Sequence, residues 1–257
     1  MTAILQKTIP YNPLEEKKLP GIQPLAPEAW LMADDAYAGQ MAERERLLAS
    51  RRDEVLQLDA RAMAAAQELL HMALDTLDPG AGETARRPDG VRVPVDWEDP
   101  LGTLGRFAQQ DFCILQKPDS APEHVLTGAV LCFPASWTLA EKFLQPLTGI
   151  HVPVDSYDAG IAARVQRLFD GVQAGRPLWR FNALWYHDPA LFQPRSQLAP
   201  RDRPHGSRAG YLRSEKQVIM RLPQTRAVVF AIHTRVLGRA DVMRQWRAPQ
   251  ADGGGQL

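Results

Sequence analysis

The chain has 257 residues, of which 45% are hydrophobic and 23% charged, and its 30 basic residues balance its 30 acidic ones. This composition is typical of a globular protein with a substantial core. The balanced charge excludes a strong overall field, so we expect neither a nucleic acid nor a membrane as a partner.

The two cysteines of the sequence, Cys113 and Cys132, each lie in an apolar run. This pattern predicts packed, reduced thiols in a cytoplasmic protein rather than disulfides. An iron–sulfur cluster held by cysteines needs four thiolates, so this chain is not expected to hold one. No apolar run approaches 18 residues, and we expect neither a membrane span nor an export signal.

The first part of the sequence predicts mainly helices. Residues 1–27 contain five prolines and predict an extended surface arm, and a helix is expected over 27–48. Apolar residues spaced three and four apart predict a further helix over 55–72, capped by Ser50 and Asp53. Its apolar stripe is expected to pack in the core, and a coiled-coil seam that would form a homo-oligomer is the alternative.

A loop is expected at residues 78–100, with a short extended piece within it. Asp99 and Pro100 then predict the start of another helix. The buried face of this helix would run from Leu101 to Leu115, which would place Asp111 near its centre.

After Pro118 the pattern changes to period two. It predicts a helix near residues 157–175 and strands at 124–133, 178–186, 212–222 and 227–236. We therefore predict an α+β fold, a mostly antiparallel sheet with flanking helices and an N-terminal helical segment. The predicted domain spans 28–245, with a helical part at 28–117 and a sheet part at 118–245. A disordered tail is expected after it, at 246–257.

A histidine with a restrained backbone lies between the first two of these strands. His151 stands between Ile150 and the Val152-Pro153 step, and a proline restricts both its own φ and the conformation of the preceding residue. An imidazole held in this way on an apolar segment suits a haem iron. A buried histidine bonded to a backbone carbonyl is the alternative.

Alternation along the later strands places polar side chains on common faces. Arg180 and Asn182 point to one side of their strand, and Arg213, Glu215 and Gln217 to one side of the next. Such a row could line a pocket for an acidic group, because an arginine fork suits the carboxylate of a haem propionate. A row that faces water is the alternative.

Four motifs in this order resemble those of the haem-dependent oxidative N-demethylase family. They are Phe133-Pro134-x-x-Trp137-x-Leu139-x-Glu141-Lys142, Ile150-His151-x-Pro153-Val154, Arg180-x-Asn182 and Leu212-Arg213-x-Glu215-x-Gln217-x-x-x-Arg221-Leu222-Pro223. The resemblance extends from about Pro24 to about Val236. It implies a PAS-like sheet that binds haem b. The reaction that it implies oxidises a small secondary amine such as dimethylamine with O₂ to the primary amine and formaldehyde.

The resemblance also implies roles for individual residues. His151 would be the axial iron ligand. Glu215 or Asp111 would receive the substrate ammonium, since a buried cation requires a countercharge. Asn182 is grouped with these two as catalytic, and the other expected haem contacts are Arg180, Lys142, Arg213 and Trp137.

Activation of O₂ at a haem requires electrons, and the sequence has neither a G-x-G-x-x-G fingerprint nor enough cysteines for a cluster. Flavin and iron–sulfur groups are therefore expected on separate reductase subunits, as the family resemblance also implies. Two alternatives remain, a PAS-like sensor of haem or a small ligand without turnover, and a divergent paralogue that has lost haem.

The sequence departs from the family pattern at a few positions. The segment 143–145 lacks an expected glycine, and Ala183 stands where tryptophan is common. Lys216, His233 and Arg235 replace other residue types in the last two strands. These departures are expected to lie near the pocket, where they would affect the choice of substrate.

Overall fold

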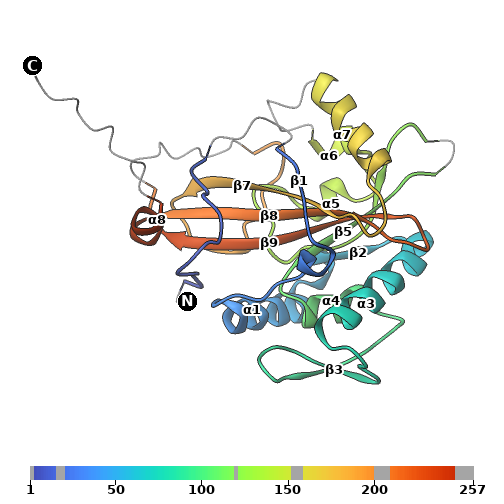
Figure 1. The fold of residues 1–257 in the computed structure, drawn as a ribbon, viewed down its shortest axis with the longest axis horizontal. Helices are drawn as coiled ribbons and strands as arrows, with labels where there is room; N and C mark the ends of the chain where they lie inside the picture. The colour runs from blue at the N-terminus through green and yellow to red at the C-terminus, as the bar shows by residue number, and fades with distance from the viewer. Residues whose placement is uncertain (1–2, 16–20, 119–120, 152–158, 200–208, 247–257) are drawn as a thin grey trace, which may run out of the picture.

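The computed structural model describes residues 3–15, 21–118, 121–151, 159–199 and 209–246. In these ranges the chain forms a seven-stranded antiparallel sheet, in the order β1-β7-β8-β9-β5-β6-β2, and a two-stranded hairpin, β3-β4 (Figure 1). The strands are β1 (Gln23–Pro24), β2 (Leu56–Leu58), β3 (Thr84–Arg86), β4 (Arg92–Pro94), β5 (Asp111–Gln116), β6 (Val125–Val130), β7 (Leu178–Tyr186), β8 (Tyr211–Arg221) and β9 (Val228–Gly238).

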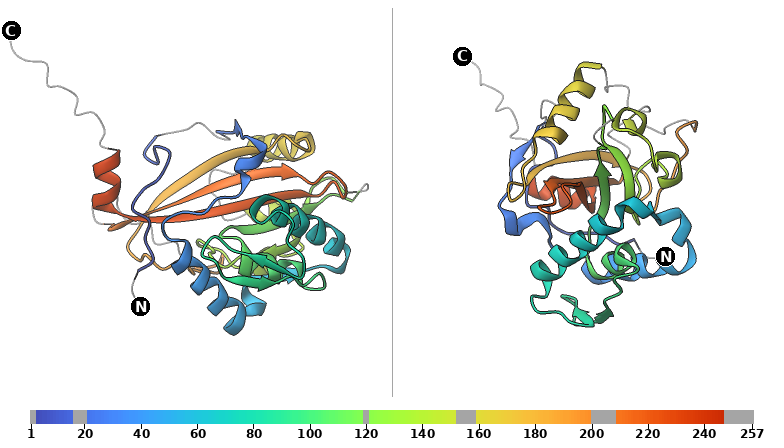
Figure 2. Two further views of the ribbon diagram at one scale, coloured as in Figure 1. Left: turned by 60° about the horizontal axis from the view of Figure 1, so that its bottom comes forward. Right: turned by 90° about the vertical axis from the view of Figure 1, so that its right-hand side faces the viewer.

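Helices cover both faces of the large sheet. Figure 2 shows α7 above the sheet in its right-hand view, and the helices of the N-terminal half below it. The helices are η1 (Pro27–Trp30), α1 (Tyr37–Ser50), α2 (Arg52–Val55), η2 (Ala60–Ala62), α3 (Met63–Leu77), α4 (Pro100–Phe107), α5 (Leu139–Lys142), α6 (Leu147–His151), α7 (Ala159–Gly171) and α8 (Arg239–Gln245). None of the helices in the described ranges combines the length and apolar character that a membrane crossing needs.

The two faces of the sheet carry separate apolar cores. The larger core joins the sheet to α1, α3 and α4 through fully buried residues such as Leu47, Leu69 and Leu104. The smaller core, here called the upper cluster, joins the opposite face to α5, α6 and α7. Its buried members are Cys113, Leu115, Leu126, Ala129, Leu131, Leu139, Leu147, Phe169, Val172, Ile219, Val228 and Ile232. The predicted α+β class is confirmed by this arrangement.

The predicted helix over 55–72 is wrong in its first part. Leu56–Leu58 forms the edge strand β2, paired with residues 128–130 of β6. A Cβ on Gly128 would lie 2.9 Å from Leu58 Cδ1, so the glycine allows this side chain to approach. Asp59 then starts η2, because its carboxylate accepts a bond of 2.9 Å from the backbone N of Arg61. The predicted cap at Ser50 and Asp53 is also wrong, since α2 begins after Arg51 with no side-chain cap bond.

The helix predicted to begin at Pro100 is confirmed only as far as Phe107. Asp99 caps it through a bond of 3.1 Å from the backbone N of Gly102, but Ala108 is extended. The following residues form the central strand β5, between β9 and β6. Its apolar run, Phe112–Leu115, is buried on both faces of the sheet. A run of this kind suits a buried strand as well as a helix, and only tertiary pairing distinguishes the two.

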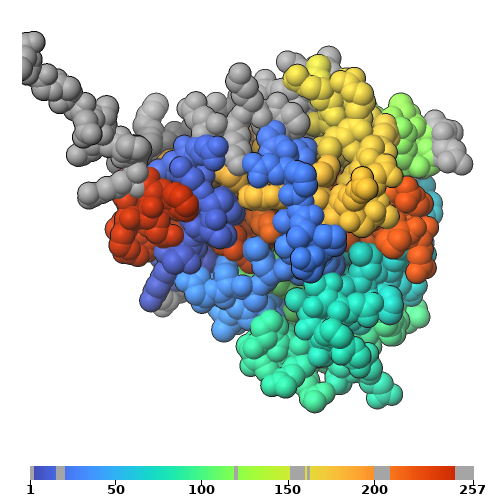
Figure 3. Space-filling model, in the orientation of Figure 1, coloured from blue at the N-terminus to red at the C-terminus, as the bar shows by residue number. Residues whose placement is uncertain are grey.

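The N-terminal residues lie against the sheet, across the front of the molecule in Figure 3. Gln6 exchanges two hydrogen bonds with the backbone of Val236, of 2.9 and 2.8 Å. Tyr11 stacks on Phe181 with 4.5 Å between the ring centroids. The predicted helix over 27–48 divides into η1 and α1, because the carboxylate of Asp34 accepts a bond of 3.1 Å from Ala36 N and shapes a turn between them.

Among the predicted elements at the end of the chain, α7 and the three long strands β7, β8 and β9 are confirmed. Thr138 is the N-cap of α5, but its side chain makes no cap bond. The carboxylate of Glu141 instead accepts bonds of 2.6 Å from Ser196 Oγ and 3.1 Å from Gln197 N. Of the predicted disordered tail, all but Trp246 lies outside the described residues.

His124 is a buried histidine at the start of β6. Its side chain is 3% exposed, and its ring contacts the edge of the Phe169 ring at 5.6 Å between centroids. Nδ1 lies 3.2 Å from Gln166 Nε2 and 3.9 Å from a carboxylate oxygen of Asp170. Because the amide nitrogen is a donor, Nδ1 is the acceptor, and the neutral ring carries its proton on Nε2.

Acidification is expected to destabilise the protein through His124. Burial lowers the pKa of His124 to about 4, although the nearby Asp170 carboxylate opposes the shift. The unfolded chain, with a pKa near 6.5, binds the proton more readily. The free energy of unfolding should therefore fall by roughly 2–3 kcal/mol as the pH decreases from about 7 to 4. Urea unfolding over this range should show a weaker pH dependence for His124→Gln than for the parent.

The exposed His71 provides the matched control, since its side chain is 63% exposed. His71→Gln should keep the pH dependence of the parent. Equal pH dependence in the parent and in His124→Gln would contradict the expected role of the buried ring.

Candidate functional site

Strand register brings the predicted polar residues of β7 and β8 together on one face of the sheet. Arg180 lies opposite Gln217, and Asn182 lies opposite Glu215. Residues two positions along each strand, such as Ile219 of β8, belong to the upper cluster. These polar side chains therefore share the face that α5, α6 and α7 cover (Figure 2), as the alternation of the sequence predicted.

Glu215 is held by three polar neighbours. Its Oε2 accepts bonds from Asn182 Nδ2 at 3.3 Å and from Gln217 Nε2 at 3.2 Å. Its Oε1 lies 3.5 Å from Arg213 Nε, and the side chain is 13% exposed. The carboxylate is thus oriented by neutral amides and remains partly accessible, which leaves it able to receive a cation.

Arg180 lies on the same face, and its guanidinium Nε has no hydrogen-bond partner in the described part of the chain. This atom is buried and, among the described residues, bonds to nothing. Burial lowers the pKa of Arg180, while the charge of Glu215 opposes the shift. Thr234 of β9 lies opposite Glu215, and its buried Oγ1 is also without a described partner. Buried polar atoms normally have partners, so these two atoms are available to a ligand on this face.

Arg213 has a positioning role in this structure. Its Nη1 donates to the carbonyl of Leu191 at 2.9 Å and its Nη2 to the carbonyl of Phe133 at 2.5 Å. The guanidinium therefore ties two loops to β8 at the end of the polar row. Both Nη groups of Arg213 thus have protein acceptors, while its Nε, like that of Arg180, has no hydrogen-bond partner in the described ranges.

Lys142 connects α5 to α6. Its side chain is buried, and Nζ donates to the carbonyl of Gly149 and to Gln197 Oε1, both at 3.2 Å. Burial lowers the pKa of Lys142. The bond to Gly149 fixes the turn of α6 that precedes His151.

His151 is the last residue of α6, and its ring lies outside the described residues. The preceding Ile150 packs against the upper cluster, as does the half-buried Trp137. The backbone of residue 151 therefore lies in the layer of helices that covers the polar face. Its predicted role as an iron ligand stays a prediction.

Asp111 has a set of partners that the sequence did not reveal. Its carboxylate pairs with Arg44 Nη1 at 2.6 Å and accepts bonds from Cys132 N at 2.8 Å and Phe133 N at 2.9 Å. Arg44 is fully buried and also donates to the carbonyl of Gly105. A countercharge at 2.6 Å and two backbone donors already satisfy the Asp111 carboxylate. The cation of Glu215, Arg213, lies farther from its carboxylate, at 3.5 Å.

Four of the departures from the family pattern lie on the face of the sheet opposite the polar row. Lys216 lies opposite His233, and their side chains alternate with those of the polar row. Ala183 and Arg235 have the same alternation. All four therefore point toward the other face of the sheet. His233 is packed there, bonded to Asp34 at 2.8 Å.

A scan of the sequence against protein-family models gives a match over residues 21–79 and 81–251. The matching model describes haem-dependent oxidative N-demethylase, alpha subunit-like proteins. The match covers the polar face, α5, α6, α7 and all of the helices from η1 to α4.

Proposed function

Because the chain belongs to the haem-dependent oxidative N-demethylase, alpha subunit-like family, we propose that it is the haem-binding oxygenase component of a multi-subunit enzyme. Its proposed substrate is a small secondary amine such as dimethylamine. The amine, O₂, two electrons and two protons would yield the primary amine, formaldehyde and water. The family assignment itself covers haem dependence and the alpha-subunit character, and the substrate is part of the proposal.

The arrangement of the sheet supports a PAS-like haem fold. The five longest strands follow the order β6-β5-β9-β8-β7, and the connection from β6 to β7 contains α5, α6 and α7. These helices form a layer over one face of the sheet. The apolar side chains of the upper cluster lie between this layer and the sheet. Haem is a planar, mostly apolar macrocycle with two propionate groups at one edge. Its binding site therefore needs an apolar surface with cations beside it.

The unpartnered Arg180 Nε on this face is the observation that carries the proposal. A buried guanidinium beside an apolar cluster fits the propionates of haem b, because a carboxylate would supply the missing acceptor. Lys142, at the α5–α6 connection, is a second candidate donor. His151 would provide the axial ligand from the end of α6, and Trp137 would contact the macrocycle from the upper cluster. These residue types, an imidazole, two cations and an aromatic ring, are the ones that haem b requires.

Bound haem would supply the activation of O₂. The chain's own contribution is to hold the amine. We assign the substrate ammonium to Glu215 rather than to Asp111, because Arg44 already neutralises Asp111. Asn182 and Gln217 keep the Glu215 carboxylate in one orientation, which positions the methyl group of the amine.

Electrons would come from partner subunits that carry flavin and an iron–sulfur cluster. This part of the proposal follows from the cysteines, since the sequence has two and both are buried in the sheet region. Burial raises the pKa of the Cys132 thiol to about 12. Such thiols are poor ligands and poor redox groups.

The proposal is tested by the absorption spectrum of the full chain expressed with a haem precursor and then titrated with dimethylamine. We expect a Soret band that shifts saturably with the amine. A protein without a Soret band would support a paralogue that has lost haem. A Soret band without amine response, and without formaldehyde release when a reductase is supplied, would support a sensor.

Glu215→Gln is expected to weaken the amine-induced spectral shift at least about tenfold, because the ammonium loses a charge-assisted bond. Haem content should not change. Gln217→Ala should have a smaller effect, since it removes only one orienting amide. The change is measured by amine titration at constant haem concentration, and superimposable curves for parent and Glu215→Gln would exclude this role.

A further inference from the structure

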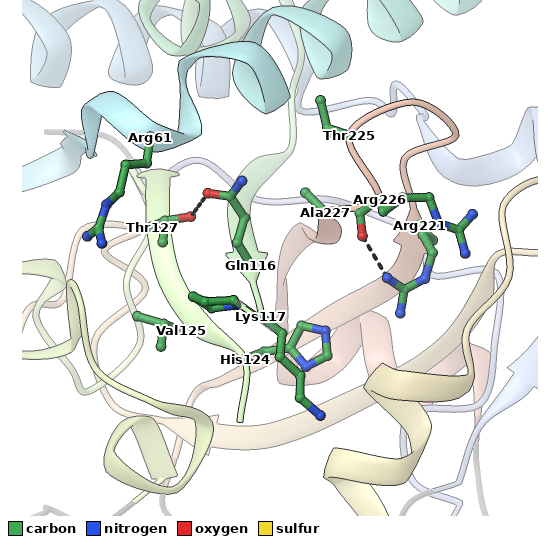
Figure 4. A pocket seen from close by; sticks show the side chains of 11 residues that line it. Arg61, Gln116, Lys117, His124, Val125, Thr127, Arg221, Thr225, Arg226 and Ala227 are labelled. Atoms are coloured by element: carbon green, nitrogen blue, oxygen red, sulfur yellow. Dashed lines mark hydrogen bonds between the residues drawn. The ribbon is translucent and has the colours of Figure 1, made fainter. Parts of the chain in front are cut away.

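A basic pocket lies at the end of the sheet where the β5–β6 and β8–β9 hairpins separate. Its volume is about 310 Å³. Figure 4 shows side chains from both hairpins and from η2 around it. No lining residue in the described ranges is Asp or Glu, and the lining consists of Arg61, Gln116, Lys117, Pro118, His124, Val125, Thr127, Arg221, Thr225, Arg226 and Ala227.

Only some of the cations that line this pocket are paired with carboxylates, and these carboxylates lie outside the pocket. Arg61 pairs with Asp59 at 2.7 Å, and Lys117 pairs with Asp170 at 2.9 Å. Arg226 has no carboxylate partner among the residues that the structure describes. The pocket therefore keeps a positive charge after these pairs are considered.

Arg221 adds a further cation that is fixed in place by carbonyl groups. Its Nε donates to Val172 O at 2.7 Å, and its Nη2 donates to Phe169 O at 2.5 Å, so it caps the end of α7. Its Nη1 donates to Arg226 O at 2.6 Å, as Figure 4 shows. This last bond holds the turn in which Arg226 adopts a φ of +62°. A non-glycine residue in this left-handed region is uncommon and is typical of constrained, often functional turns.

The imidazole of His124 supplies a neutral donor inside the pocket. His124 has its proton on Nε2, because its Nδ1 accepts from Gln166. The hydroxyl groups of Thr127 and Thr225 also line the pocket, but they donate to Gln116 Oε1 at 2.8 Å and to Glu68 Oε2 at 2.5 Å. The imidazole N–H together with the guanidinium groups matches the oxygens of an anion.

We propose that this pocket binds a phosphoryl group, either as free inorganic phosphate or as part of a small phosphorylated molecule. A phosphoryl group is favoured over a singly charged anion, because it carries more than one negative charge and the pocket has several cations. The volume exceeds that of the ion alone and leaves room for a small organic portion. This site is separate from the polar face and does not depend on haem.

The test is calorimetric titration of the full chain with inorganic phosphate and, separately, with glycerol 3-phosphate, at constant ionic strength. We expect saturable binding with a Kd on the order of 1 mM or lower. The ring resonances of His124 should shift with the same saturation curve in NMR spectra. At least about tenfold tighter binding of the ester would assign a phosphorylated small molecule, and equal or weaker binding would assign free phosphate.

Arg226→Asn is the discriminating variant, because asparagine tolerates a positive φ and the change removes the guanidinium group without requiring a different turn. We expect about tenfold weaker phosphate binding. Arg226→Lys should retain most of the affinity, and Arg92→Asn on the distant β3-β4 hairpin should match the parent. Non-saturable heats, no response of His124, or equal losses for Arg226→Asn and Arg92→Asn would overturn the proposal.

Discussion

His151→Ala is expected to remove most of the Soret absorbance of the protein expressed with a haem precursor. The substitution deletes the only atoms of residue 151 that can bind iron. Loss of residues that merely orient a metal ligand weakens metal binding by about 10–100-fold, and loss of the ligand itself should cost at least as much. The haem-to-protein ratio and the Soret maximum, measured on folded, monodisperse protein, report the effect.

Two controls separate ligation from general damage. His187→Ala alters an exposed histidine after β7 and should leave the spectrum unchanged. Added imidazole should restore a Soret band to His151→Ala, because a free imidazole can occupy the position of the missing ring. A spectrum and haem content equal to those of the parent would remove His151 as the axial ligand.

Asp111→Asn is expected to destabilise the folded chain by about 3–5 kcal/mol, because it leaves the fully buried Arg44 without its countercharge. The asparagine retains the size of the side chain but turns one acceptor into a donor that faces the backbone N of Cys132 or Phe133. Urea unfolding of the haem-free protein measures the loss. Glu54→Gln, in an exposed pair with Arg51, should change stability by less than about 1 kcal/mol.

A double-mutant cycle with Arg44→Met identifies the source of the loss. The double variant should be more stable than the sum of the single losses predicts, since it buries no unpaired guanidinium. Additive losses would contradict a direct pair. Asp111→Asn should also keep the amine-induced spectral shift per bound haem, and its disappearance would return the ammonium role to Asp111.

Period-two alternation was sufficient to predict the polar row of β7 and β8. Because side chains alternate along a strand, Arg180, Asn182, Arg213 and Glu215 could be assigned to common faces before the strands were paired. The motifs around these residues likewise predicted the family that the later match shows. These features depend on neighbours within a few residues, where sequence patterns are most informative.

Local patterns failed for β2 and β5. Leu56–Leu58 and Phe112–Leu115 have spacings that suit a helix as well as a buried strand, and their pairing with β6 and β9 decides between the two. The same limit applied to Asp111. Its partner Arg44 is 67 residues away, so no local pattern could show that the carboxylate was already neutralised.

The amino-acid sequence by itself determined the α+β class, the long C-terminal strands and the side chains that share a face, because each depends on short-range periodicity. The tertiary structure alone decided which buried charges are satisfied and which are not. It paired Asp111 with Arg44, bonded His233 to Asp34, and left Arg180 Nε without a described partner. The physical reason is that desolvation and charge pairing depend on distances between residues remote in the chain, which only the packed fold establishes.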